Sequence, residues 1–267
     1  MRSFTRWALL SLLFAFSVGS GGCGYVRYLI PLNPTASVDA PPLTHLAWDG
    51  LLKKYVNEAG LVNYKGLQAD SLALNAYLRE LSAHLPSTSW TPTDRLAYWI
   101  NAYNAFTVQR IIRSYPVKSI KDLGGDKIFV NTPWDQPFIR LADARYSLND
   151  LEQRIIRKKF ADNRIHVALV CAAMSCPRLR NEAFTGPRLN EQLDDQARGF
   201  VNNPAKNKLT PADKPQGSSI FNFYPQDFTK NGSTSVQDFI NRYAVQKIKP
   251  DAVLSYVPYD WSLNVQR

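Results

Sequence analysis

The sequence predicts a helix-rich α+β domain with a small mixed or antiparallel sheet. Apolar residues recur at helical spacing in several stretches, while a short run at residues 164–171 is apolar and β-branched. Segments rich in Pro, Gly and Ser separate some of these stretches. With 267 residues and 45% hydrophobic content, the chain can form one large domain or two small ones, and its composition excludes a disordered or collagen-like protein. We expect one domain preceded by a leader.

The expected elements follow from this periodicity and from residues that mark helix ends. A central helix begins near Thr93 and ends before Pro116, because a residue that precedes Pro disfavours the helical conformation. Ser147 and Asp150 have the spacing of a capping box, which predicts the start of a later helix. We expect helices near residues 48–56, 72–81, 93–113, 147–159, 189–202 and 236–245, and strands at 164–171, near Leu209 and Ile220, and at 253–257.

The first 22 residues are typical of a secretory signal peptide. Arg2 and Arg6 precede an apolar run, residues 7–18, that is too short to span a bilayer as a helix. Small residues before Cys23 resemble a bacterial lipobox, in which the Cys carries the lipid. Ordinary cleavage that leaves a free thiol is the alternative, because Ser20 stands where a lipobox usually has Leu. We expect a signal peptide (1–22), a Pro-containing tether (23–43) and a single domain (44–267).

The compartment decides which partner a basic protein meets. The chain has 32 Lys and Arg against 22 Asp and Glu, and removal of the two leader arginines lowers its net charge only from +10 to +8. In an exported protein this charge favours an anionic lipid or envelope polymer over nucleic acid, with a solvated surface that binds nothing specific as the alternative. Gly24 is not the Asp that retains enterobacterial lipoproteins at the inner membrane. We therefore expect a membrane anchor through Cys23 at the outer membrane, facing the periplasm.

Two amide side chains stand out in the predicted central helix. Asn101 and Asn104 lie three residues apart, on one face of a helix that is otherwise apolar on most sides. Buried amides must find hydrogen-bond partners. They can bond the backbone of a neighbouring loop, which is a structural role, or line a pocket and hold a ligand.

Residues 166–179 hold one of the three histidines and both cysteines outside the leader region. Cys171 and Cys176 can form a disulfide in an oxidising periplasm. Alternatively, Cys176 is a thiol nucleophile activated by His166, with Arg178 and Arg180 lowering its pKa. Both thiols can also be buried and inert. The spacing of His and Cys does not suit zinc, and the chain has no phosphate-binding Gly-rich loop, so we expect no metal and no cofactor.

The chain also resembles the domain of unknown function family 547, over about residues 45–265. The resemblance rests on four blocks: residues 60–64 (GLVNY), 97–105 (AYWINAYNA), 164–179 (RIHVALVCAAMSCPRL) and 259–264 (YDWSLN). The family implies no established reaction, but the Asn pair, His166 and both cysteines fall within its blocks. A looser similarity to transglutaminase-like and papain-like folds rests on a buried helix followed by a His-bearing strand. Those folds place a nucleophilic Cys at the start of the helix, and residues 94–113 contain none.

Three hypotheses about function follow. The first is an exported, lipid-anchored envelope protein of unknown biochemical activity, with a ligand pocket formed by Asn101, Asn104, His166 and Arg178. The second is a Cys-dependent acyl transferase, amidase or peptidase in which Cys176 and His166 are catalytic. The third is an envelope scaffold without catalysis, so the sequence leaves open whether the protein is an enzyme.

Overall fold

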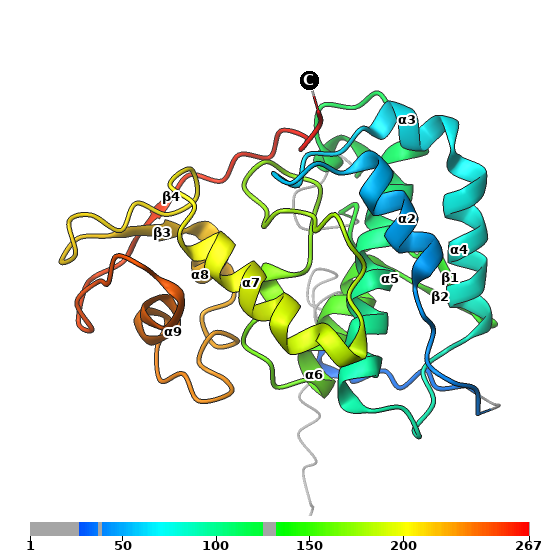
Figure 1. Ribbon diagram of the computed structural model, residues 1–267, viewed down its shortest axis with the longest axis horizontal. Coiled ribbons are helices and arrows are strands. Elements are labelled where there is room, and N and C mark those ends of the chain that lie inside the picture. Colours follow the sequence, from blue (N-terminus) through cyan, green and yellow to red (C-terminus); the bar gives the residue numbers. More distant parts are fainter. Residues whose placement is uncertain (1–26, 37–38, 125–131, 267) are drawn as a thin grey trace, which may run out of the picture.

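The central element of the computed structural model is α5 (Pro92–Ile112), a 21-residue helix in which sixteen residues are buried (Figure 1). Thr91 caps this helix, since its Oγ1 accepts a hydrogen bond from the N–H of Asp94. A helix that is apolar on most sides has to be covered on most sides. The structure describes residues 27–36, 39–124 and 132–266, so the predicted signal peptide and Cys23 lie outside the described residues.

Three helices from the first part of the chain pack together on one side of α5. They are α2 (Leu46–Tyr55), α3 (Tyr64–Ala69) and α4 (Ser71–Ala83). Both α3 and α4 pack against α5, and α2 packs against α3 and α4. Trp48 of α2 stacks on Tyr77 of α4 with 5.8 Å between ring centroids. The predicted helices near 48–56, 72–81 and 93–113 are confirmed, whereas the short α3 was not predicted.

A hairpin and a π-helical segment follow α5. The antiparallel strands β1 (Ile139–Leu141) and β2 (Ala144–Tyr146) lead into η3 (Asp150–Ile156), which continues as α6 (Arg157–Lys159). The capping box is present, because the N–H of Asp150 donates to Ser147 Oγ and the N–H of Ser147 donates to a carboxylate oxygen of Asp150. The predicted helix at 147–159 is therefore confirmed in place, although residues 150–156 are π-helical.

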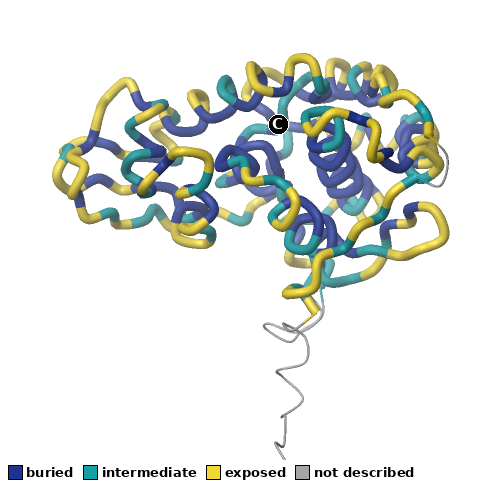
Figure 2. The backbone as a smooth tube through the Cα atoms, turned by 90° about the horizontal axis from the view of Figure 1, so that it is seen from below, coloured by how far each residue is buried: buried dark blue, intermediate teal, exposed yellow. Residues whose placement is uncertain are grey.

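The C-terminal part of the chain forms a second apolar cluster beside the one that surrounds α5. It contains α7 (Leu189–Val201), α8 (Ser219–Phe223) and α9 (Val236–Tyr243), together with the parallel pair β3 (Gln216–Ser218) and β4 (Ser255–Val257). Figure 2 shows buried segments inside both regions and exposed ones around them. Short 3-10 turns lie at Arg27–Leu29 (η1), Ile120–Leu123 (η2), Ile165–Val167 (η4) and Gly186–Arg188 (η5). The helix-rich α+β fold is confirmed, with two sheets of two strands each among the described residues.

Two predicted strands are wrong. The segment 164–171 forms a 3-10 turn, η4, followed by irregular backbone. Side chains take the place of a neighbouring strand there: Asn104 bonds the backbone of Ala168 and Val170, and Gln196 donates to the carbonyl of Val167. Ile220 lies in α8, whose first turn is capped by Ser218. Near Leu209 there is a single bridge, Lys208 to Gln216, and the strand at 253–257 is confirmed as the shorter β4.

The C-terminal segment joins distant parts of the chain. Asn264 accepts a hydrogen bond from the Tyr64 hydroxyl at 2.7 Å, and Leu263 pairs with Ala173 in an isolated bridge. The N–H of Met174 donates to the carbonyl of Ser262. Residues 60–64 and 259–264 thus lie against the loop that carries both cysteines. Among the described residues, none of the helices has the length and apolar character needed to cross a membrane.

Candidate ligand cavity

A cavity with a volume of about 230 Å³ lies between α5, η3, η4, α8 and the C-terminal segment. Six of its thirteen lining residues are Phe, Tyr or Trp, and the wall also includes one histidine, one carboxylate and two sulfurs. The lining residues are Tyr103, Trp134, Asn149, Glu152, His166, Leu169, Cys171, Cys176, Ile220, Phe223, Tyr224, Tyr259 and Trp261. We call this space the aromatic cavity.

His166 is held in a fixed orientation in this wall. Its ring stacks on Tyr224 with 3.8 Å between centroids and an interplanar angle of 13°. Its Nε2 lies 2.7 Å from a carboxylate oxygen of Asp227, to which the ring N–H donates. Only 3% of the His166 side chain is exposed. A buried imidazole anchored by a carboxylate is a common arrangement for positioning a histidine in a site.

Asp227 anchors His166, and its carboxylate interacts with three side-chain donors. Besides His166, the ammonium of Lys230 lies 2.6 Å from Oδ1, and the guanidinium of Arg157 pairs with Oδ2. Burial alone would raise the pKa of Asp227, but hydrogen bonds from these three side chains outweigh it and hold the pKa well below its usual range. Asp227 is therefore ionised at neutral pH and compensates two cations next to the cavity.

Glu152 is a second buried carboxylate, and it faces the cavity. Its Oε1 lies 3.8 Å from Nδ1 of His166, which is too long for a hydrogen bond. The pKa values of Tyr103 and Tyr224 lie well above the usual value for tyrosine. Burial is the largest cause, and the charge of the nearby Glu152 carboxylate is the second. Within residues 27–36, 39–124 and 132–266, no Lys or Arg pairs with Glu152. Gln153 Nε2 donates to Glu152 Oε1 at 3.3 Å. The cavity thus holds a carboxylate that has a neutral donor but no Lys or Arg partner in the described part of the chain.

Cys171 and Cys176 form a disulfide in the cavity wall. The backbone N–H of Cys171 donates to the Cys176 sulfur at 3.0 Å, and the Tyr259 hydroxyl lies 3.2 and 3.1 Å from the two sulfurs. The Lys206 ammonium closes the turn from outside by donating to the carbonyls of Met174 and Cys176. Of the three states considered for the cysteines, the structure has the disulfide. Catalysis by Cys176 would require reduction of this disulfide.

Three of the residues predicted for a pocket do not line the cavity. Asn101 donates to the carbonyl of Phe184 at 2.7 Å and accepts from its N–H at 3.0 Å. Asn104 does the same for the carbonyl of Ala168 and the N–H of Val170, each at 2.9 Å. Both amides therefore pin loops to α5, which is the structural role considered above.

Arg178 also points elsewhere. Its guanidinium bonds Gln196 and Asp195 of α7, and Arg180 pairs with Asp195 as well, so acidic partners already engage both arginines proposed to activate Cys176. Gly60, with φ +79°, packs so closely that a Cβ there would lie 2.5 Å from Cβ of Arg178. Residues 60–64 and the segment around Arg178 are therefore in close packing contact, which is a structural role.

Part of the cavity was predictable from the sequence. His166, Cys171 and Cys176 line it, whereas Glu152, Asp227 and Tyr259 were not singled out. Tyr259 and Trp261 lie in the C-terminal block YDWSLN, which was a usable signal. No group of three or more His, Cys, Asp and Glu side chains suited to a metal ion occurs in the part of the chain that the structure describes.

Comparison with known proteins adds one finding. Neither the curated proteins nor the solved structures contain a match to this chain. Residues 87–201, which include α5, His166 and both cysteines, match the model of the family described as "Protein of unknown function, DUF547", and this supports the domain family that the sequence blocks indicated.

Proposed function

We propose that this protein is an exported, lipid-anchored protein of the bacterial periplasm that binds a small envelope-derived ligand in the aromatic cavity. The leader pattern and the lipobox-like residues before Cys23 support export and anchoring. The cavity, which is partly open to solvent and has a fixed His166 and aromatic side chains in its wall, supports a binding site. The family match names no activity that would oppose this function.

The ligand class follows from Glu152. A buried carboxylate is costly unless a cation or several hydrogen bonds compensate it. Six aromatic side chains line the same cavity: Tyr103, Trp134, Phe223, Tyr224, Tyr259 and Trp261. Aromatic faces attract organic cations, and a desolvated contact contributes about 2 kcal/mol. A ligand with an amine or quaternary ammonium group would match both features, and the single observation that carries this assignment is the buried Glu152 without a Lys or Arg partner.

The test uses choline and its uncharged carbon analogue, 3,3-dimethylbutanol. We expect choline to bind, with quenching of Trp134 or Trp261 fluorescence, and the neutral analogue to bind at least about tenfold more weakly. Glu152→Gln should weaken choline binding about 10- to 100-fold, because a hydrogen bond or ion pair to a charged group contributes about 1.5–3 kcal/mol. Calorimetric titration measures both effects.

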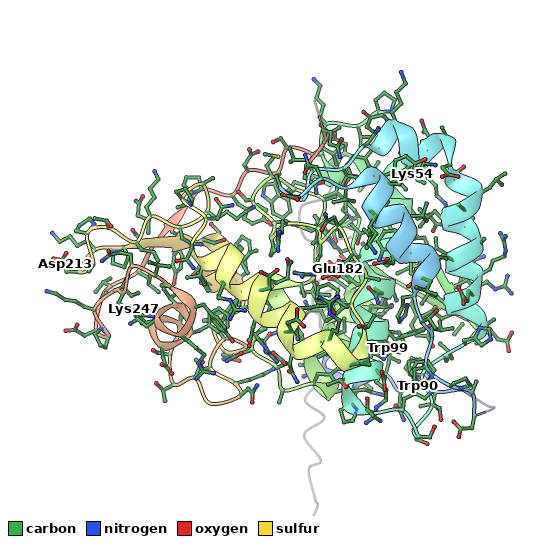
Figure 3. The ribbon with its side chains drawn as sticks, viewed as in Figure 1. Lys54, Trp90, Trp99, Glu182, Asp213 and Lys247 are labelled. Carbon is green, nitrogen blue, oxygen red and sulfur yellow. A yellow bond between two sulfur atoms is a disulfide. The ribbon has the colours of Figure 1, made fainter. Side chains whose placement is uncertain are left out.

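The matched control is Asp213→Asn. It removes one negative charge from an exposed residue at the outer end of the β3 region, for which the structure describes no ion pair (Figure 3). Its choline affinity should equal that of the unmodified protein. Equal binding of choline and its neutral analogue would contradict the assignment of a cation, and unchanged affinity in Glu152→Gln would show that this carboxylate is not the counterion.

Acyl transfer by Cys176 is a second candidate function, and one observation favours it. The backbone N–H of Cys171 and the hydroxyl of Tyr259 both point at the Cys176 sulfur, so a thiolate formed there on reduction would be stabilised. In this function the disulfide is the resting form, and His166 is the nearby base.

Alkylation of the periplasmically purified protein separates these functions. For a structural disulfide we expect Cys171 and Cys176 to react only after reduction. Cys171→Ser and Cys176→Ser should then lower the free energy of unfolding equally, by about 2 kcal/mol for so short a loop. Intact mass and urea unfolding measure this. Once the disulfide has been reduced, rapid alkylation of Cys176 below about pH 7, with loss of turnover in Cys176→Ser alone, would instead establish the nucleophile. A scaffold would show neither turnover nor choline binding.

A further inference from the structure

A second cavity, of about 460 Å³, lies on another part of the molecule and shares no lining residue with the aromatic cavity. It is enclosed by the N-terminal segment at residues 33–35, the loop at 86–88, the first turns of α5 and the end of α6. Its lining residues are Asn33, Pro34, Thr35, Pro86, Ser87, Thr88, Pro92, Arg95, Trp99, Lys159 and Phe160. We call it the Arg95–Lys159 cavity, and Figure 3 labels Trp99 in its wall.

Among the described residues, two cations and no acidic side chain line this cavity. Neither Arg95 nor Lys159 forms an ion pair within the described ranges, whereas Arg154 and Arg157 do. The Nε of Arg95 is buried and has no hydrogen-bond partner among the described residues. Partial desolvation of its ammonium lowers the pKa of Lys159, and the charge of Arg95 lowers it further. The two positive charges in this cavity repel each other. An anion bound between them would attract both and offset this repulsion.

The neutral groups around these cations indicate which class of anion the cavity can bind. Thr88 and Thr35 can supply hydroxyl donors, and Lys159 is held by the side-chain oxygen of Asn33. A guanidinium, an ammonium and two hydroxyls together suit a tetrahedral anion with several acceptor oxygens. Trp99, Phe160 and three prolines form the apolar part of the wall, which suits the carbon substituent of an ester. Inorganic anions such as chloride would use none of this apolar wall.

We propose that the Arg95–Lys159 cavity binds a phosphate ester. Two sources share this chemistry: a phospholipid headgroup and a free phosphorylated metabolite. Residues 33–35 lie only ten to twelve positions after Cys23, and an extended chain covers at most about 3.6 Å per residue. If Cys23 is lipidated, the cavity wall therefore lies within about 45 Å of the bilayer. The anion chemistry itself does not depend on the anchor or on the ligand of the aromatic cavity.

The test uses the chain from Gly24 onward, which contains every described residue and no lipid. Glycerol 3-phosphate is the free probe, and vesicles of phosphatidylcholine with or without phosphatidylglycerol are the lipid probe. We expect Lys159→Gln and Arg95→Gln each to weaken phosphate-ester binding at least about tenfold. Lys158→Gln is the matched control, because it removes the same charge from the neighbouring exposed residue, for which the structure describes no partner.

The outcomes separate the sources. Binding of phosphatidylglycerol vesicles that is lost in Lys159→Gln and kept in Lys158→Gln supports a lipid headgroup. Binding of glycerol 3-phosphate with the same pattern, without retention on vesicles, supports a free phosphate ester. The proposal is overturned if neither probe binds, or if Lys158→Gln and Lys159→Gln weaken binding equally, since the attraction is then only that of a basic surface. Lys159 is exposed, so Lys159→Gln keeps the test valid even if Arg95→Gln folds poorly.

Discussion

Replacing Asn104 by Leu is expected to lower the free energy of unfolding by about 3 kcal/mol. Leu has the same number of side-chain non-hydrogen atoms as Asn and the same branching at Cγ, but it can neither donate nor accept a hydrogen bond. The substitution therefore leaves the carbonyl of Ala168 and the N–H of Val170 without their partner in a buried part of the protein. Each buried polar group that loses its partner costs about 1–3 kcal/mol. Urea unfolding, followed by circular dichroism, measures the loss.

The control for this prediction is Asn222→Leu. Asn222 is exposed in α8, and the structure describes no hydrogen bond of its side chain. Its substitution should shift the urea midpoint only slightly. Asn101→Leu should resemble Asn104→Leu, because Asn101 bonds both backbone groups of Phe184. If Asn104→Leu unfolded at the midpoint of the unmodified protein and lost only ligand binding, the pocket role that the sequence suggested would be restored.

The Asn pair shows how far sequence reasoning reaches. Helical spacing places Asn101 and Asn104 on a buried helix, and the physical requirement for hydrogen bonds then follows. Which groups meet that requirement cannot be read from the sequence, because the partners lie 83 and 64 residues further along the chain. The helices were predictable because their apolar spacing is local, whereas partners across the fold depend on the packing of whole elements.

The segment 164–171 shows a second kind of limit. Its β-branched and apolar residues favour a strand, but a strand needs a neighbour to satisfy its backbone. Asn104 and Gln196 supply those hydrogen bonds from two helices, so the backbone can be buried without a sheet. Composition indicated correctly that the segment is buried, and only its conformation was wrong.

The aromatic cavity was partly predictable for a related reason. His166 and the cysteines were singled out because such residues are rare in this chain. Glu152 and Asp227 are common residue types. The periodic pattern around Glu152 is that of an ordinary amphipathic helix, and Asp227 lies between the predicted strand near Ile220 and the predicted helix at 236–245. Only the fold places Asp227 against His166, 61 residues away in the sequence.

Replacing Asp227 by Asn is expected to lower the free energy of unfolding at neutral pH by about 3 kcal/mol, because it leaves buried or partly buried cations without their anion. Asp227 accepts from His166 and pairs with Arg157 and Lys230, and only 3% of its side chain is exposed. The amide of Asn has one acceptor oxygen and an NH₂ group that would face a guanidinium. His166 would also lose the carboxylate that orients it, so choline binding in the aromatic cavity should weaken as well.

The pH dependence provides the decisive readout. The pKa of Asp227 is depressed in the folded protein relative to about 3.9 in an unfolded chain. A depressed pKa stabilises the folded state fully above about pH 5, and this stabilisation is lost as the pH falls through about 4 and below. The unmodified protein should therefore lose more stability between pH 5 and pH 3 than Asp227→Asn does. Asp213→Asn, which removes an exposed carboxylate, should keep the full acid loss. Equal acid loss in the Asp227→Asn variant and the unmodified protein would mean that this carboxylate does not stabilise the fold through its charge.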